Sequence, residues 1–485
     1  MLGEKKMVER RLGAITAPLS LAGKIKRYYT FVCVPVLALG FSGAALTPAS
    51  ALPSFARQTG QPCAACHTAF PQLTPFGRRF KLGGYTLGGG EESPFIPPLA
   101  VMVQSTYTHY NRGLDAPSGI YMPPSPNGGF PNMNDFTDLA QQSSLFYAGK
   151  IYGNLGAFVQ LTYANDYGRV FSLDNADVRY ADTVKFGKTD LLYGLTVNNN
   201  PTVQDVWNTT PVWSSPFITS SFALSPVAST MIEGFGPSQT LGAGGYVFLA
   251  DTFYAELSGY GSLTPKVQTT LGSSPPSTAM TINGVAPYWR LAIEPVWGDH
   301  SWEVGAYGMI ANIIPDRIYG YGTNNVSDFG FDTQYQWITD KHAVTLRANY
   351  IFEKQQLTST YAQGNSANPY DYLRSLKVSA EYVYDHTYSI TGTYFNLNGS
   401  PDAIIYANNV FTSPNSAGWI ADVAFLPFSH GAPGPWPWFN TRLGVSYTMF
   451  TKFDGGSTNI DPVGCPNCRN ANNNNTLLVY AWTAF

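Results

Sequence analysis

Beyond about residue 98, the chain consists of short segments in which apolar and polar residues alternate. In 373–385, for example, Lys377, Ser379 and Glu381 share one face of an extended chain, and the residues between them are apolar. A period of two residues is typical of β-strands with one apolar and one polar face. The pattern predicts sixteen strands, at residues 99–111, 137–152, 155–165, 173–186, 190–199, 239–249, 252–262, 286–297, 301–313, 326–338, 342–356, 373–385, 387–398, 416–428, 439–452 and 476–485.

The connections between these segments are alternately short and long. Tight turns are expected at 153–154, 187–189 and 298–300, whereas connections such as 200–238 are much longer. Outer-membrane barrels have short turns on the periplasmic side and long loops outside. One connection departs from this rule, because 429–438 is long and proline-rich where a tight turn is expected. The alternation of short and long connections predicts an antiparallel barrel. Both ends of the strand series would lie on the periplasmic side, with Phe485 in the closing strand.

Charged residues on the polar faces indicate an interior away from lipid. Arg347 and Glu353 share a face in 342–356, and Arg290 and Glu294 share one in 286–297. Each would cost about 2–4 kcal/mol at the midplane of the lipid-facing surface. Sixteen strands enclose a water-filled channel unless something occupies it. We therefore expect an all-β membrane protein with a sixteen-stranded, porin-like barrel over residues 99–485.

The composition agrees with this prediction. Charged residues make up 12% and aromatic residues 14% of the chain, and its mean hydropathy is −0.10. Neutral hydropathy excludes a bundle of membrane helices, while alternating lipid-facing and lumen-facing residues would produce it. A soluble all-β protein is the alternative on composition alone.

Residues 1–51 have the features of a signal peptide, which predicts export to the outer membrane. A basic region precedes the apolar stretch 31–46, which is too short for a stable membrane helix, and a small-residue cleavage pattern ends at Ala51. The leader holds 7 of 28 Lys+Arg and 2 of 31 Asp+Glu, so the mature chain would carry 21 against 29, a net charge of −8. This acidic balance argues against nucleic acid as a partner.

Cleavage would leave four cysteines in two C-x-x-C pairs. The first pair, Cys63 and Cys66, is followed at once by His67, and C-x-x-C-H is the attachment motif for c-type haem. Two thiols at this spacing can form thioethers with both vinyl groups of a haem, and the adjacent imidazole can bind its iron from the same side. A disulfide or zinc knuckle is the alternative, but no second pair of metal ligands lies nearby in the sequence. The motif predicts one covalently bound haem c.

Residues 52–98 contain this motif. A segment this short rarely folds independently without a covalent or metal cross-link. We expect a monohaem cytochrome c segment that folds around its haem and plugs the barrel lumen. Nearby aromatic residues would shield the haem from water, namely Phe70, Phe76, Phe80 and Tyr85. Nearby cations would contact the haem propionates or, alternatively, face solvent, namely Arg57, Arg78, Arg79 and Lys81.

The stretch from Pro53 to Tyr85 resembles the fused cytochrome-porins of the outer membrane of iron-oxidising bacteria. The resemblance is carried by Phe55-Ala-Arg57-Gln-Thr-Gly, the Cys63/Cys66/His67 motif and Phe76-Gly-Arg78-Arg-Phe-Lys81, and the length and strand number also match. It implies a single-haem plug in a sixteen-stranded barrel. It also implies that electrons pass from extracellular Fe(II) to periplasmic carriers, either cytochromes or copper proteins. The residues by themselves indicate only a haem-bearing barrel.

The sixth ligand of the haem iron has two candidates, both in the first strand. After His67, the next methionine or histidine residues are Met102 and His109. Alternation places Met102 on the lumen face with Gln104, and His109 on the lipid face or outer rim. A methionine ligand raises the haem potential, which suits an acceptor of electrons from iron. We therefore favour Met102, with ordinary packing as the alternative.

Other candidate residues lie in the connections. Cys465 and Cys468 predict a short loop disulfide, or alternatively a redox or metal site. His300, His342 and His386 fall at turns and are expected at the periplasmic rim. The loop aspartates can attract Fe(II) but are better explained as solvated surface, namely Asp205, Asp371, Asp402 and Asp461. Sparsely charged outer loops fit the hypothesis of a low-pH exterior, typical of an acidophile.

The sequence supports three functions. The first is a ferrous-iron oxidase, an oxidoreductase that needs no acid–base or nucleophilic residues, and no motif for such residues is found. The second is a diffusion porin with a structural or gating haem plug. The third is a conduit that delivers electrons outward.

Overall fold

The computed structural model describes residues 52–90, 97–114, 133–164, 171–209, 215–220, 222–236, 238–272, 281–407, 409–430, 436–458, 460 and 469–485. The predicted leader and the cysteine pair Cys465 and Cys468 lie outside these residues. Among the described residues, no helix has the length and apolarity that crossing a membrane requires.

Three short helices precede the strands, at α2 (Pro53–Thr59), α3 (Cys63–Cys66) and α4 (Pro75–Leu82). The strands are β1 (Leu99–Leu114), β2 (Met133–Tyr152), β3 (Leu155–Ala164), β4 (Phe171–Phe186), β5 (Thr189–Asn198), β6 (Thr240–Leu249), β7 (Phe253–Ser262), β8 (Ala286–Ile293), β9 (Val296–Trp297), β10 (His300–Ile313), β11 (Asn324–Ile338), β12 (His342–Gln356), β13 (Tyr370–Tyr384), β14 (Tyr388–Gly399), β15 (Ser416–Phe425), β16 (Asn440–Lys452) and β17 (Thr476–Ala484). The connections contain α5 (Pro201–Gln204), α6 (Pro265–Thr270), α7 (Thr358–Ala362), η1 (Pro315–Arg317) and η2 (Ala471–Asn474).

The described strands form a closed antiparallel barrel. Each strand pairs with its neighbours in the chain, and β1 pairs with both β2 and β17. β8 and β9 both pair with β10 and form one strand that is interrupted at Glu294–Pro295. With these two counted as one, the barrel has sixteen strands, which confirms the predicted number and architecture.

The two faces of the strands differ as predicted. On β12 and β8, Arg347, Glu353 and Arg290 are buried toward the lumen, whereas Leu346 and Leu291 on the opposite faces are exposed. Several charged groups inside the barrel form ion pairs, as Arg290 does with Asp332 at 2.5 Å. The exposed outer face is rich in apolar residues, as a lipid-facing surface requires.

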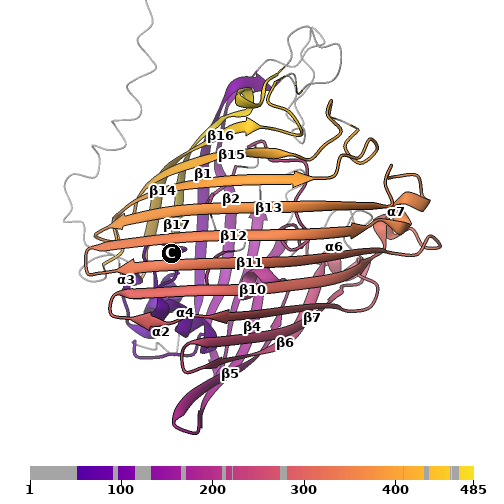
Figure 1. The fold of residues 1–485 in the computed structure, drawn as a ribbon. Helices are drawn as coiled ribbons and strands as arrows, with labels where there is room; N and C mark the ends of the chain where they lie inside the picture. The colour runs from indigo at the N-terminus through magenta and orange to yellow at the C-terminus, as the bar shows by residue number, and fades with distance from the viewer. Residues whose placement is uncertain are drawn as a thin grey trace, which may run out of the picture. The chain divides into compact units, whose positions relative to one another are not determined.

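The N-terminal helices lie at one end of the barrel. Figure 1 shows α2, α3 and α4 where short hairpins join the strands, and α6 and α7 at the opposite end. Hydrogen bonds fix the segment there, including one from the backbone N–H of Lys150 to the side-chain oxygen of Gln58, at 2.7 Å. The segment therefore packs against the inner wall at the short-turn end.

The long connection 200–238 differs from the prediction of an outer loop. Its described residues turn inward, and Trp207 is 1% exposed. The indole N–H of Trp207 donates to Glu294 at 2.8 Å, and the N–H of Ile232 donates to Asp328 at 2.8 Å. Asp205 is buried as well, and so are Asp371 and Asp402 in other connections, so the expectation that these aspartates are solvated surface is wrong. Asp461 lies outside the described residues. The inward-facing polar residues of the barrel bind this segment, because they would otherwise lack hydrogen-bond partners.

The proline-rich connection between β15 and β16 is long because it contacts the N-terminal helices. Ser429 accepts a hydrogen bond from the N–H of Ala64 at 3.1 Å, and the Trp438 ring lies 4.7 Å from the Arg57 guanidinium. Its described residues therefore contact α2 and α3 instead of making a tight turn.

Candidate functional site

Local sequence signals fold the N-terminal segment around its cysteines. Pro75 begins α4, and the hydroxyl of Thr74 caps it by accepting from the N–H of Gly77 at 3.1 Å. Gly77 is required by close approach, since a Cβ there would lie 2.2 Å from the carbonyl oxygen of Cys66. This contact packs α4 directly against α3, which carries both cysteines.

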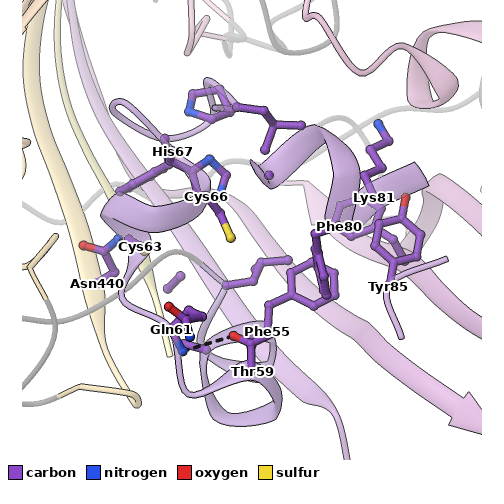
Figure 2. Close-up of a pocket in the computed structure, with 18 of the residues that line it drawn as sticks. Phe55, Thr59, Gln61, Cys63, Cys66, His67, Phe80, Lys81, Tyr85 and Asn440 are labelled. Atoms are coloured by element: carbon purple, nitrogen blue, oxygen red, sulfur yellow. Dashed lines mark hydrogen bonds between the residues drawn. The ribbon is translucent and has the colours of Figure 1, made fainter. Parts of the chain in front are cut away.

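The three residues of the haem motif line one cavity. Cys63 and Cys66 begin and end α3, and the N–H of His67 donates to the carbonyl of Cys63 at 2.7 Å. All three side chains border a space of about 1140 Å³, which includes the part that opens to solvent. In Figure 2 the Cys66 sulfur points into the space between α3 and the rings of Phe55 and Phe80.

The chemical state of these side chains fits a covalently held haem. Both cysteines are free thiols, and burial raises the pKa of Cys66 to about 11 and that of Cys63 well above its usual value. Burial also lowers the pKa of His67 to about 4, so the imidazole is neutral, as a metal ligand must be. Its Nδ1 is buried without a hydrogen-bond partner. These donors match what a c-type haem needs, two thiols and one neutral imidazole.

Aromatic rings form much of the cavity wall. Phe55 lies 5.0 Å from Phe80 and 5.6 Å from Tyr85 between ring centroids. The barrel contributes further rings from β2, β3 and β17, namely Phe146, Phe158 and Trp482. Phe70, Phe80 and Tyr85 line the cavity as predicted, whereas Phe76 is 43% exposed and borders a different groove. Phe76 therefore does not border the cavity, because its position on α4 points it toward the groove that Ala64 and Ala65 of α3 also border.

The two candidate sixth ligands lie on opposite faces of β1. Met102 is 2% exposed and lines the cavity together with His67. His109 lies on the other face, where its Nδ1 is 2.8 Å from a carboxylate oxygen of Asp135. The alternation predicted from the sequence is confirmed, and a ligand role for Met102 stays a prediction.

The four predicted propionate-binding cations have different roles. Lys81 lines the cavity, and its ammonium donates to the carbonyl of Asp205 at 2.9 Å. Arg78 is buried in an ion pair with Glu294, and Arg79 pairs with Asp251 on a barrel turn. Arg57 donates to the carbonyl of Leu99 at 2.5 Å. Of the four, only Lys81 borders the described cavity, because the barrel wall supplies partners for the arginines.

Sequence reasoning missed the barrel residues that complete the site. Asn440 at the start of β16 donates to the sulfur of Cys63 at 3.5 Å. Trp482 packs edge-on against Phe70, with ring centroids 5.1 Å apart. Strand alternation could have shown that Phe146 and Trp482 face inward, but not that they meet the cysteines.

The predicted rim histidines lie at the short turns. His300 contacts the hydroxyl of Tyr335 at 2.8 Å, and His342 contacts that of Tyr382 at 2.8 Å. His386 lies 3.2 Å from the carbonyl of Thr68, beside the haem motif. Within the part of the chain that the structure describes, no three His, Cys, Asp or Glu side chains form a metal-binding group.

Comparisons with known proteins found distant similarity to solved structures. No family model and no curated protein matches the chain. Among solved structures, OprB of Pseudomonas putida is 12% identical, with 80% of this chain and 94% of that chain covered and a TM-score of 0.44. DcaP of Acinetobacter baumannii is 13% identical, with coverage of 80% and 96% and a TM-score of 0.42. OmpT of Vibrio cholerae is 8% identical, with coverage of 80% and 97% and a TM-score of 0.38.

Proposed function

We propose that this protein is an outer-membrane electron conduit that oxidises extracellular Fe(II) and reduces a periplasmic carrier. The observation that carries the proposal is the convergence of Cys63, Cys66 and His67 on one aromatic-lined cavity inside a closed barrel. The outer membrane is supported by the barrel with its apolar outer face, and iron as the donor by the resemblance of residues 53–85 to fused cytochrome-porins.

The overall reaction moves one electron. Fe(II) outside becomes Fe(III), and one oxidised periplasmic carrier becomes reduced. A haem bound through Cys63, Cys66 and His67 supplies one-electron chemistry at the cavity. The aromatic wall and Met102 keep water away, which helps hold a high potential.

A series of buried aromatic side chains and two arginines runs from the cavity to Tyr307 in the middle of β10. Arg179 lies between Tyr85 and Tyr246, at 5.8 and 5.2 Å from their ring centroids. Tyr254 then lies 6.1 Å from Tyr246 and 5.3 Å from Trp207. Further along, Arg290 connects Trp207 to Tyr307, at 4.7 and 5.3 Å. Side chains packed at these distances support electron transfer through this part of the interior, which favours a conduit.

A diffusion porin with a structural or gating haem plug is the second candidate. The closed sixteen-stranded barrel is the observation that favours it, since barrels of this size form aqueous pores. A conduit that delivers electrons to the outside would share every structural feature with the first candidate. The two would differ only in the midpoint potential of the haem.

Rapid mixing of the purified protein with Fe(II) at acidic pH tests the proposal. Fast haem reduction, together with a midpoint potential that allows Fe(II) to be the donor, is expected. Absence of reduction combined with a large bilayer conductance would establish the porin function instead. A haem midpoint potential too low to accept electrons from Fe(II) would instead support the conduit that delivers electrons outward.

Covalent attachment is tested separately by replacing both thiols. On a denaturing gel, haem is expected to stay with the wild-type polypeptide and to be lost from the double variant Cys63→Ser/Cys66→Ser. A wild-type chain without haem in the gel would overturn the cofactor assignment.

A further inference from the structure

A second groove lies on the opposite side of the haem motif. It is bordered by Ala64 and Ala65 of α3, by Pro75 and Phe76 of α4, and by the short turns that carry Asp299 and Asp340. The groove is at the short-turn end of the barrel, where the N-terminal helices lie.

The same two helices separate this groove from the haem cavity. In α3, Cys63 and Cys66 border the cavity, whereas Ala64 and Ala65 between them border the groove. In α4, Phe76 borders the groove and Gly77 borders the cavity. Because a helix with its side chains is about 10–12 Å across, a protein seated in the groove would lie within one helix diameter of the attachment site.

The groove has an apolar floor and an acidic rim. Phe76 is 43% exposed and Val296 is 52% exposed, although both are apolar. Asp299 and Asp340 on the rim are exposed, and neither forms an ion pair with another described residue. Lys341 beside Asp340 carries the opposite charge, while Asp385 on the next turn adds a third carboxylate near His430. Apolar centres with charged rims are typical of transient interfaces, in which the rim guides encounter.

We propose that this groove is the docking surface for a small soluble electron carrier with lysines around its exposed redox centre. The proposal rests on the electron-conduit function above. The acidic rim attracts the lysines, and the alanine-bearing face of α3 lets the partner approach the haem motif closely. This protein then passes one electron, received from Fe(II), to the partner, and that electron reduces the oxidised redox centre of the partner.

Binding of a lysine-rich soluble c-type cytochrome to the full-length haem-loaded protein in detergent tests this surface. Asp299→Asn/Asp340→Asn is expected to weaken the affinity by about three- to tenfold at low salt, with the difference lost at high salt. The matched control is Asp182→Asn/Asp190→Asn, which removes two carboxylates from the β4–β5 hairpin at the same end of the barrel. Equal weakening in both variants, or none in either, would overturn the docking site.

A second variant probes the apolar floor. Phe76→Ser is expected to weaken binding at both low and high salt, because apolar contact is not screened. Fe(II) reduction of the haem is measured on each preparation without the cytochrome. Normal reduction with unaltered cytochrome affinity refutes the docking site alone, whereas failed reduction refutes the conduit. Tighter binding of an acidic cytochrome than of the lysine-rich one would also overturn the proposal.

Discussion

Met102 and His67 reach the same cavity by two different backbone rules. His67 follows the short helix α3 directly, so its position is fixed by the cysteine spacing. Met102 lies on β1, where each second residue faces the lumen, and it shares that face with buried Gln104 and Thr106. At the scale of single residues, alternation therefore decides that Met102, and not His109, lines the cavity together with His67.

The ligand role of Met102 predicts a spectroscopic change in Met102→Leu. This substitution keeps the side-chain volume and should cost less than about 1.5 kcal/mol, but it removes the sulfur. The weak sulfur-to-iron charge-transfer absorption of the oxidised protein should disappear. Met309→Leu, a buried site in a different cluster of the barrel, is the control and should leave the spectrum unaltered. An unaltered spectrum in Met102→Leu would make Met102 a packing residue.

His386 predicts a loss of stability in acid. Burial lowers its pKa below the ordinary value of about 6.5, so the unfolded chain takes up the proton first as the pH falls. The stability that neutral His386 contributes is therefore present above pH ~6.5 and is lost below it. His386→Asn should flatten the decline of the thermal midpoint in this range, as measured by circular dichroism. His342→Asn, at the neighbouring turn, is the comparison.

The helices of the N-terminal segment depend on the barrel for their position. The guanidinium of Arg78 pairs with Glu294, and it also donates to Gln336 at 2.8 Å and to the carbonyl of Leu73 at 2.8 Å. Arg79, one residue further, pairs with Asp251 where both side chains are partly exposed. Two adjacent arginines of α4 therefore each form an ion pair with a carboxylate of the barrel, one buried and the other exposed.

This difference predicts unequal effects of the two arginines. Arg78→Met leaves Glu294 buried without its counter-charge and should destabilise the attachment of the segment by about 3–5 kcal/mol. Arg79→Met should cost less than about 1 kcal/mol. Limited proteolysis that follows cleavage between α4 and β1 measures detachment while the barrel stays intact. Similar proteolysis of both variants would contradict the anchoring role of Arg78.

The elements were largely predictable from the sequence, and the partners of the inward side chains were not. Strand positions follow from local alternation, and the cysteine motif from fixed spacing. The inward turn of 200–238 depends instead on hydrogen bonds between distant residues, such as Trp207 with Glu294. The pairing of Arg78 with Glu294 could not be predicted for the same reason, since the two residues lie 216 positions apart in the chain. Local pattern reports which face a residue occupies, but not which residue it meets there.

The molecule as a whole is a barrel whose interior is built from separate parts of the chain. The N-terminal helices pack at the short-turn end, and the inward segment around Trp207 binds Arg290 and Glu294 further along. The side chain of Asn208 joins the two parts by donating to the carbonyl of Pro71 at 3.2 Å. These contacts occupy a lumen that sixteen strands would otherwise leave open.

An occupied lumen predicts a small ionic conductance. In planar bilayers the wild-type protein should pass much less current than a variant that lacks both 52–90 and 217–235. Migration of the variant on unheated gels shows whether its barrel still closes. Equal currents from the two proteins would favour the porin function.

Both ends of the described chain contribute to the cavity that Cys63, Cys66 and His67 line. Leu52 and Phe55 border it from the start, and Trp482 and Ala484 from the last strand. Phe485 completes the closure by exchanging backbone hydrogen bonds with Val101, at 2.8 and 3.0 Å. A haem joined to Cys63 and Cys66 would therefore lie against β17, and the strand that closes the barrel would also cover part of that haem. In a chain truncated before β17 a bound haem should be more open to water, so the burial of the haem would report that the barrel has closed.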